Sequence, residues 1–92
     1  MNKIIAVAVR LEDGSMFVKE RPFRHHNVFH MMYDDFDVSS DMLENSEQGF
    51  LDNRGMFLNR KEAYILAKTN GQLLQRKAGQ YDGNELFSED LW

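Results

Sequence analysis

The feature that most constrains this chain is an apolar run near its start, Lys3–Leu11 (KIIAVAVRL). A nearly unbroken series of β-branched residues and alanines predicts a strand that is buried on at least one face. Asp13–Gly14 follows, a dipeptide suited to a tight hairpin turn. Because Ser15–Glu20 (SMFVKE) then alternates between two faces, we expect an N-terminal β-hairpin.

Beyond Pro22, which is the only proline, the period of the apolar residues changes from that of a strand to that of a helix. The spacing from His25 to Phe36 predicts an amphipathic helix of about three turns. The expected apolar face consists of His25, Val28, Phe29, Met32, Tyr33 and Phe36. The polar, acidic stretch Asp37–Gln48 predicts a loop, or one short turn at Ser40–Glu44.

The second half of the chain predicts another pair of strands and a second helix. Two short apolar runs, Gly49–Asp52 and Met56–Leu58, flank a turn that contains glycine and predict a smaller hairpin. Asn59 is a strong N-cap, and Glu62 is spaced to complete a capping box. The helix that follows is expected to end at Gly71 and to pack through a stripe of Ala63, Leu66, Ala67 and Asn70.

The end of the chain is expected to pack rather than to extend into solvent. Gln72–Gly83 is mixed and predicts irregular structure, with a short strand at Leu73–Arg76 as an alternative. Glu85–Trp92 (ELFSEDLW) is apolar enough to dock through Leu86, Phe87, Leu91 and Trp92. The predicted fold is thus a small α+β domain spanning residues 1–92. It has an N-terminal β-hairpin, two amphipathic helices, a short second hairpin and a packed C-terminal tail.

Composition excludes several functional classes. A chain of 92 residues is long enough for one domain, and its 11 basic and 15 acidic residues give a net charge of −4. This balance disfavours a general nucleic-acid binder. The absence of cysteine excludes a disulfide scaffold and a thiolate metal site. No apolar run approaches the ~18 residues of a membrane span. We therefore expect a cytoplasmic protein with no membrane partner, no direct nucleic-acid partner and no cofactor.

All the histidines lie within one short segment, His25–His30. His26 and His30 are spaced i, i+4, and Asp34 continues the same row, so three metal ligands are conceivable on one helix face. Because no second cluster of ligands accompanies them, a solvated polar face is the favoured interpretation. His25 falls on the apolar side and is expected to be a hydrogen-bonded core residue.

Two helix starts carry basic residues that could meet an anion. Arg21 and Arg24 flank the first, where free N–H groups and the helix dipole favour negative charge. The alternative is a pair of surface arginines beside a proline turn. Arg60–Lys61 opens the second helix, where positive charge opposes the dipole. These two residues are therefore expected either to pair with acidic neighbours or to face an anionic ligand.

Patterns typical of hydrolytic enzymes and nucleotide-binding loops are missing. No serine lies in a G-x-S-x-G setting, and no Gly-rich phosphate loop occurs. The carboxylates in Asp34–Asp35 and Glu89–Asp90 are adjacent pairs without a hydrolytic spacing. We therefore favour a protein that is not an enzyme. Its acidic loop and tail could instead present a surface to a basic partner protein.

Several short motifs follow one another from Arg24 onward. They are Gln48–Leu51 (QGFL), Gly55-x-Phe57, Arg60-x-Glu62-Ala63, Gly71–Gln72 and the ending Leu86–Trp92 (LFSEDLW), together with the early Arg24–His26. With these motifs the chain resembles a family of small phage and bacterial proteins. The ending is the most specific part of the resemblance, and the acidic segment Asp34–Glu47 lies outside it.

The resemblance implies an origin in a mobile element, where small acidic proteins often counter host defences. Such proteins either inhibit a host protein or sequester a nucleotide-like immune signal. Our leading hypothesis is a binding protein that captures a small anionic, nucleotide-like ligand, with a homodimer or higher oligomer left open. Its predicted ligand-binding residues are Arg24, His25, His26, Arg60, Gln72, Ser88, Glu89 and Asp90.

Three alternatives stay open beside this hypothesis. One is an acidic protein–protein inhibitor of a host defence protein or a nucleic-acid-binding protein. Another is a small metal-dependent hydrolase that uses His26, His30 and Asp34. Under a purely structural interpretation, Glu89 and Asp90 pair with the arginines and make the tail a latch.

Overall fold

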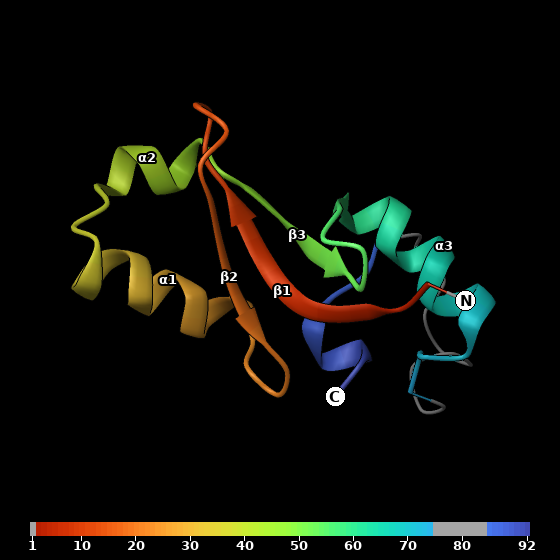
Figure 1. The fold of residues 1–92 in the computed structure, drawn as a ribbon. Helices are drawn as coiled ribbons and strands as arrows, with labels where there is room; N and C mark the ends of the chain where they lie inside the picture. The colour runs from red at the N-terminus through yellow and green to blue at the C-terminus, as the bar shows by residue number, and fades with distance from the viewer. Residues whose placement is uncertain (1, 75–84) are drawn as a thin grey trace.

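A four-stranded antiparallel sheet organises the computed structural model, which describes residues 2–74 and 85–92 (Figure 1). The strand order is β2–β1–β3–β4. The strands are β1 (Ile4–Arg10), β2 (Met16–Glu20), β3 (Glu47–Asp52) and β4 (Phe57–Asn59). The helices are α1 (His25–Asp35), α2 (Ser40–Glu44) and α3 (Arg60–Asn70), with a 3-10 turn η1 at Ser88–Asp90. The α+β fold and the N-terminal hairpin are thus confirmed.

The apolar run forms the central strand β1, which is paired on both edges. Its residues Ala6–Val9 are fully buried, which explains why small and β-branched side chains occupy both faces without alternation. The turn to β2 is wider than a two-residue turn, because it is closed by a hydrogen bond of 2.8 Å from the N–H of Leu11 to the carbonyl of Ser15. The Leu11 side chain is buried. Gly14 takes a φ of +92° within this turn, a value that favours glycine.

The first helix is confirmed, but its predicted apolar face is only partly buried. His25, Val28 and Met32 are buried, whereas Tyr33 and Phe36 are each 58% exposed, contrary to the prediction. For Phe36 the cause is the end of the helix: α1 stops at Asp35, and Asp37 has a positive φ of 56° that turns the chain away. The Phe36 ring instead packs edge-to-face with the Phe17 ring, and the two ring centres lie 5.1 Å apart.

The acidic stretch after α1 contains the short helical turn given as an alternative to a loop. This turn is α2, and the Ser39 side chain caps it by accepting a hydrogen bond from the N–H of Met42 at 3.2 Å. None of its residues is buried. α1 and α2 lie together at one end of the molecule, and α3 lies at the other (Figure 1).

The second hairpin and the second long helix form as predicted. Asn59 and Glu62 make the capping box, with hydrogen bonds of 2.8 and 2.9 Å, and Gly71 ends α3 at a φ of +80°. Ala63 and Ala67 are fully buried, which brings the backbone of α3 close to the sheet. The pairing of β3 with β1 joins the two hairpins into one sheet.

The C-terminal tail is packed, as expected. Leu86 and Leu91 are buried in the core, and Trp92 packs against it. The short strand proposed at Leu73–Arg76 does not form at residues 73 and 74, and its other half lies outside the described residues. No helix in the described ranges is long and apolar enough to cross a membrane.

Candidate functional site

The docked tail, Glu85–Trp92, lies against the start of α1, where the sequence predicts an anion site. Arg24 immediately precedes α1, and its Nη2 donates a hydrogen bond to the main-chain oxygen of Trp92. The indole Nε1 of Trp92 in turn donates to the carbonyl oxygen of Phe23 at 2.9 Å. The start of α1 is therefore in contact with the protein's own tail.

His25 is a core residue that connects α1 to β3. Its Nε2 lies 2.8 Å from the carbonyl oxygen of Gly49. Its ring packs edge-to-face with the Phe50 ring, and the two ring centres lie 5.1 Å apart. Because a carbonyl oxygen only accepts, Nε2 must carry the proton in this contact. The side chain is 7% exposed, in agreement with the expected hydrogen-bonded core histidine.

Arg60 anchors the tail from the other side. Its Nη2 donates to Oε1 of Gln48 at 2.7 Å, and its guanidinium lies 4.5 Å from the centre of the Phe87 ring. The carbonyl oxygen of Arg60 accepts a hydrogen bond from the N–H of Leu86 at 3.0 Å. The guanidinium is thus held by β3 and the tail, although its buried Nε has no hydrogen-bond partner among the described residues.

Two polar residues of the tail are buried. Ser88 and Asp90 are 3% and 1% exposed. The Asp90 carboxylate accepts a hydrogen bond from the N–H of Phe87 at 3.0 Å. The main-chain carbonyl of Asp90 accepts one from the N–H of Leu74 at 2.8 Å. The side chain of Glu89 lies outside the described part of the structure. These contacts lie within the protein, and the alternative in which Glu89 and Asp90 pair with Arg24 or Arg60 stays a prediction.

Gln72 serves β1 rather than the tail. Its Oε1 accepts a hydrogen bond from the N–H of Ile4 at 2.8 Å, and its Nε2 donates to the carbonyl of Ile4 at 2.9 Å. The amide therefore copies the pairing that a neighbouring strand would give to this residue. Asn70 fixes the orientation of the Gln72 amide by donating to the same Oε1 at 2.7 Å.

The histidine row does not assemble into a metal centre. His26, His30 and Asp34 are exposed along α1. Across residues 2–74 and 85–92, no three His, Asp or Glu side chains come together in a group able to hold a metal ion. The hydrolase hypothesis thus lacks its ligand set within these ranges.

The structure therefore brings part of the predicted set together and separates the rest. Arg24, Arg60 and the Ser88–Asp90 turn all contact the docked tail or belong to it, whereas Gln72 binds β1 and His26 faces solvent. The contacts observed for the arginines and for Gln72 are internal. The role of these residues in ligand binding stays a prediction.

A polar cleft opens beside the start of α3. It encloses about 470 Å³, and Arg60 and Lys61 line it together with the acidic residues Glu47 and Glu85. Its other lining residues are Ser46, Gln48 and Asn59. In the part of the chain that the structure describes, Arg60 and Lys61 thus line a cleft large enough for a small ligand.

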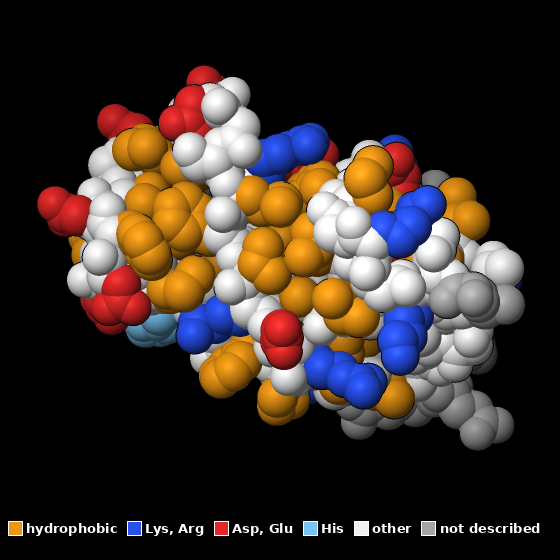
Figure 2. Space-filling view, viewed as in Figure 1, with side chains coloured by type: hydrophobic (Ala, Val, Ile, Leu, Met, Phe, Trp, Pro, Cys, Tyr) orange, Lys and Arg blue, Asp and Glu red, His pale blue; other side chains and the backbone are white. Residues whose placement is uncertain are grey.

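The strongest electrostatic feature lies at the opposite end of the molecule. No lysine or arginine occurs between Arg24 and Arg54, a stretch that includes α1, α2 and β3. In Figure 2 this end shows Asp and Glu side chains among apolar ones, while Lys and Arg lie mainly toward α3. We call it the acidic end and define it by the exposed residues Glu12, Asp13, Asp34, Asp35, Asp37, Asp41 and Glu44.

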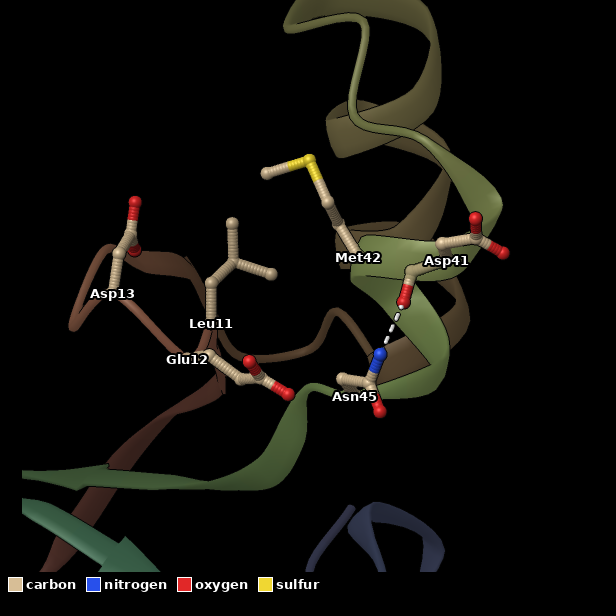
Figure 3. A pocket seen from close by; sticks show the side chains of 6 residues that line it. All are labelled: Leu11, Glu12, Asp13, Asp41, Met42 and Asn45. Atoms are coloured by element: carbon tan, nitrogen blue, oxygen red, sulfur yellow. Dashed lines mark hydrogen bonds between the residues drawn. The ribbon is translucent and has the colours of Figure 1, made fainter.

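An apolar groove lies within the acidic end, between the β1–β2 turn and α2. Leu11 and Met42 point into it from opposite sides (Figure 3). Asp13 stands on the turn side, and Asp41 lies on the side of α2 with its carboxylate directed away from Leu11 and Met42 (Figure 3). The groove encloses about 230 Å³, and Glu12 and Asn45 complete its lining. An apolar floor between carboxylates suits a basic, partly apolar partner.

Hydrogen bonds favour the charged form of the carboxylate on the turn side of the groove. The backbone N–H and the hydroxyl of Ser15 both donate to Asp13, and this lowers the pKa of its carboxyl. Asp13 is therefore ionised throughout the neutral range. Its negative charge is held in place by the turn itself, because the accepted N–H lies only two residues along the chain.

A second shallow depression lies between α1 and α2. Phe29, Tyr33 and Leu43 line it, and His30 and Asp34 stand at its edge. Together with the 44% exposed Met42, the exposed Tyr33 and Phe36 leave considerable apolar surface at this end. Exposed apolar patches rimmed by polar groups are typical of binding surfaces.

The groove was missed in the sequence because its two walls are far apart along the chain. The sequence predicts a strand end at Leu11 and a turn at Asp13, and it predicts an acidic loop or a short turn around Met42. One signal was available, namely the long stretch without any lysine or arginine. That signal locates the acidic end, but it cannot show which apolar side chains meet there.

Comparison with known proteins places the chain in a family. Residues 3–92 match the family model of the phage T4 y16D protein, and the chain belongs to that family. No curated protein and no solved structure matches it. The expected relation to small phage proteins is thereby confirmed.

Proposed function

We propose that this member of the phage T4 y16D family is a non-enzymatic binding protein that captures a basic bacterial protein at its acidic end. The observation that carries the proposal is the apolar groove between the β1–β2 turn and α2, one side of which comes from a stretch of the chain, residues 25–53, without any lysine or arginine. An inhibitor of a host defence protein or of a nucleic-acid-binding protein fits this surface. Proteins of the latter class carry the basic stripes that such a surface complements.

The division of labour within the chain supports this assignment. Motif residues such as Gly49, Arg60 and Gln72 make contacts inside the fold. The acidic segment Asp34–Glu47 lies outside those motifs, and most of its charged side chains are exposed. Glu47 pairs with Arg10 at 2.6 Å, and the remaining like charges of this segment are explained most simply by a partner of opposite sign.

Electrostatic capture predicts a specific salt dependence. Exposed charges are screened over about 8–10 Å at physiological ionic strength, so binding should weaken strongly as salt is added. The acidic end should mainly raise the association rate, and the apolar groove should mainly slow dissociation.

A capture experiment with matched variants tests the proposal. Immobilised protein is exposed to bacterial lysate at about 50 mM and about 500 mM NaCl, and retained proteins are quantified by mass spectrometry. Wild-type protein should retain a set of basic proteins at low salt and release them at high salt. Glu44→Lys should retain them several-fold less well.

The control for this experiment is Glu20→Lys, which makes the same charge change at the far end of β2. Glu20 is exposed and lies outside the acidic end. It should retain the same proteins as the wild type. Equal capture by Glu44→Lys and Glu20→Lys, or a captured set without basic proteins, would refute the proposal.

A second candidate function is the capture of an anionic, nucleotide-like ligand, such as an immune signalling molecule. The observation that favours it is the cleft beside α3, where Lys61 is exposed and the buried Nε of Arg60 lacks a described partner. Native mass spectrometry of protein purified from cells tests it directly. A co-purified phosphorylated small molecule, lost in Lys61→Ala and kept in Lys68→Ala, would support ligand capture. Loss in neither variant would move the ligand away from this cleft.

A further inference from the structure

The exposed face of α3 is chemically complementary to the acidic end. Lys61, Ile65 and Lys68 follow one another at helical spacings of four and three residues, so they lie on the same face. Ile65 is 65% exposed, the highest value among the large apolar side chains described. The nearest acidic side chain of the helix, Glu62, is engaged by the N–H of Asn59 at 2.9 Å. We call Lys61, Ile65 and Lys68 the α3 face.

The two surfaces match in charge and in polarity. The acidic end presents an apolar groove of about 230 Å³ between Asp13 and Asp41. The α3 face presents one large apolar side chain between two ammonium groups. An isoleucine seated against Leu11 and Met42 would bring the flanking lysines among the carboxylates of the acidic end.

The two surfaces cannot meet within one molecule. α1 and α2 lie at one end of the sheet and α3 at the other, so a contact between them has to involve two chains (Figure 1). Such a contact is heterologous, because it pairs different surfaces of the two copies. Heterologous contacts add copies in a row or close them into a ring.

We infer that the groove of the acidic end binds the α3 face of a second copy of this chain, so that the protein associates head to tail. One helix face against one groove is a small interface, well below the about 1,200 Å² of stable complexes. Association is therefore weak and depends on concentration and salt. Because a basic partner protein would occupy the same groove, partner capture and self-association compete.

The experiment uses two variants, each of which disables one of the two surfaces. Met42→Ser removes an apolar wall of the groove, and Ile65→Ser removes the apolar centre of the α3 face. Both side chains are exposed, so each variant should fold, which thermal unfolding verifies. Met56→Ser, the same truncation of an exposed methionine just before β4, is the control.

The oligomeric state is measured by light scattering and native mass spectrometry from about 10 µM to about 1 mM protein, a range that covers weak association. Wild type and Met56→Ser should form dimers and larger species at the highest concentrations, and added salt should dissociate them. Each surface variant alone should associate about tenfold more weakly, because one partly buried apolar side chain is lost.

Mixing the two variants gives the decisive result. Met42→Ser keeps an intact α3 face, and Ile65→Ser keeps an intact groove, so a mixture should form one-to-one pairs and nothing larger. A wild-type protein that stays monomeric at about 1 mM overturns the inference. So does a mixture that associates no better than either variant alone.

Failure of this inference is distinguishable from failure of the proposed function. Ile65→Ser leaves the acidic end unchanged, so it should lose self-association and still capture basic proteins from lysate. Glu44→Lys should weaken both processes. Capture without self-association in the wild type would overturn the inference and leave the proposed function in place.

Discussion

Gly49→Ala tests the most confined position of the sheet. A Cβ at Gly49 would lie 2.3 Å from the carbonyl oxygen of Leu58 and 2.4 Å from the Phe57 ring. The oxygen belongs to the neighbouring strand β4, so it cannot move away without disturbing the β3–β4 pairing. The ring can move only by leaving the guanidinium of Arg10, which lies 4.2 Å from its centre.

The expected cost follows from these contacts. Inserting a methyl group into a packed site costs about 1–3 kcal/mol, and contact with backbone places Gly49→Ala at the upper end. The alanine also restricts the unfolded chain, which returns about 0.4–1 kcal/mol. We therefore expect a net loss of about 2 kcal/mol, or about 8–16 °C in Tm for a domain of this size.

Urea unfolding followed by far-UV circular dichroism measures this loss. Gly14→Ala is the control, because a Cβ there meets nothing within 4 Å. Its free energy of unfolding should fall only through the strain of an alanine at a positive φ of 92°. Gly49→Ala should lower the midpoint by clearly more than Gly14→Ala, with an unchanged m-value. If the two variants are equally destabilised, crowding at Gly49 is not what excludes a side chain.

Three further outcomes are expected. Burial alone would raise the pKa of Asp52, but hydrogen bonds from Met56 and Arg54 and the charge of Arg54 lower this pKa below its value in the unfolded chain. The ionised carboxylate therefore stabilises the fold fully above about pH 4, and this stabilisation is lost as the pH falls through the lower folded pKa. When urea midpoints are compared between about pH 2 and 5, the loss should be smaller in Asp52→Asn than in the wild type. Gln72→Ala leaves the N–H and carbonyl of Ile4 without their amide partner and should cost about 1–3 kcal/mol, with faster hydrogen exchange at that N–H; unchanged exchange would contradict the pairing. Arg24→Ala should loosen the tail, which tryptophan fluorescence reports as a red shift, and an unshifted spectrum would show that the arginine does not hold it.

The parts of the fold that were predicted correctly depend on local signals. The capping box of Asn59 and Glu62 and the helix end at Gly71 are set by residues a few positions apart. The exposure of Phe36 was mispredicted because a helical wheel assumes that the helix continues, whereas Asp37 turns the chain. The pairing of β3 with β1 depends on contacts between distant segments, which periodicity does not encode. The same holds for the hydrogen bonds between the Gln72 amide and the backbone of Ile4.

The candidate site shows the same limit. An anion site at the start of α1 requires that the N-terminal N–H groups and Arg24 be accessible to a ligand. In the fold the arginine is bound to the main-chain oxygen of Trp92, 68 positions further along the chain. Local chemistry predicted that Arg24 would find an acceptor, but it could not show that the acceptor belongs to the protein itself.

The acidic end also implies a conflict between stability and binding, and Glu44→Lys makes it measurable. Glu44 ends α2, where a negative charge opposes the helix dipole, and one other carboxylate, that of Asp41, lies on the same short helix. Its replacement by lysine should therefore stabilise the protein, by about 0.3–0.5 kcal/mol at low salt.

The same substitution should weaken capture of basic proteins and self-association, because both depend on negative charge around the groove. Gains in stability that reduce function are typical of residues kept for binding. Thermal unfolding at low and high salt, beside the capture assay, separates the two effects. A Glu44→Lys protein that is less stable than the wild type, or more stable and still fully competent to bind, would show that the charges at this end serve the fold.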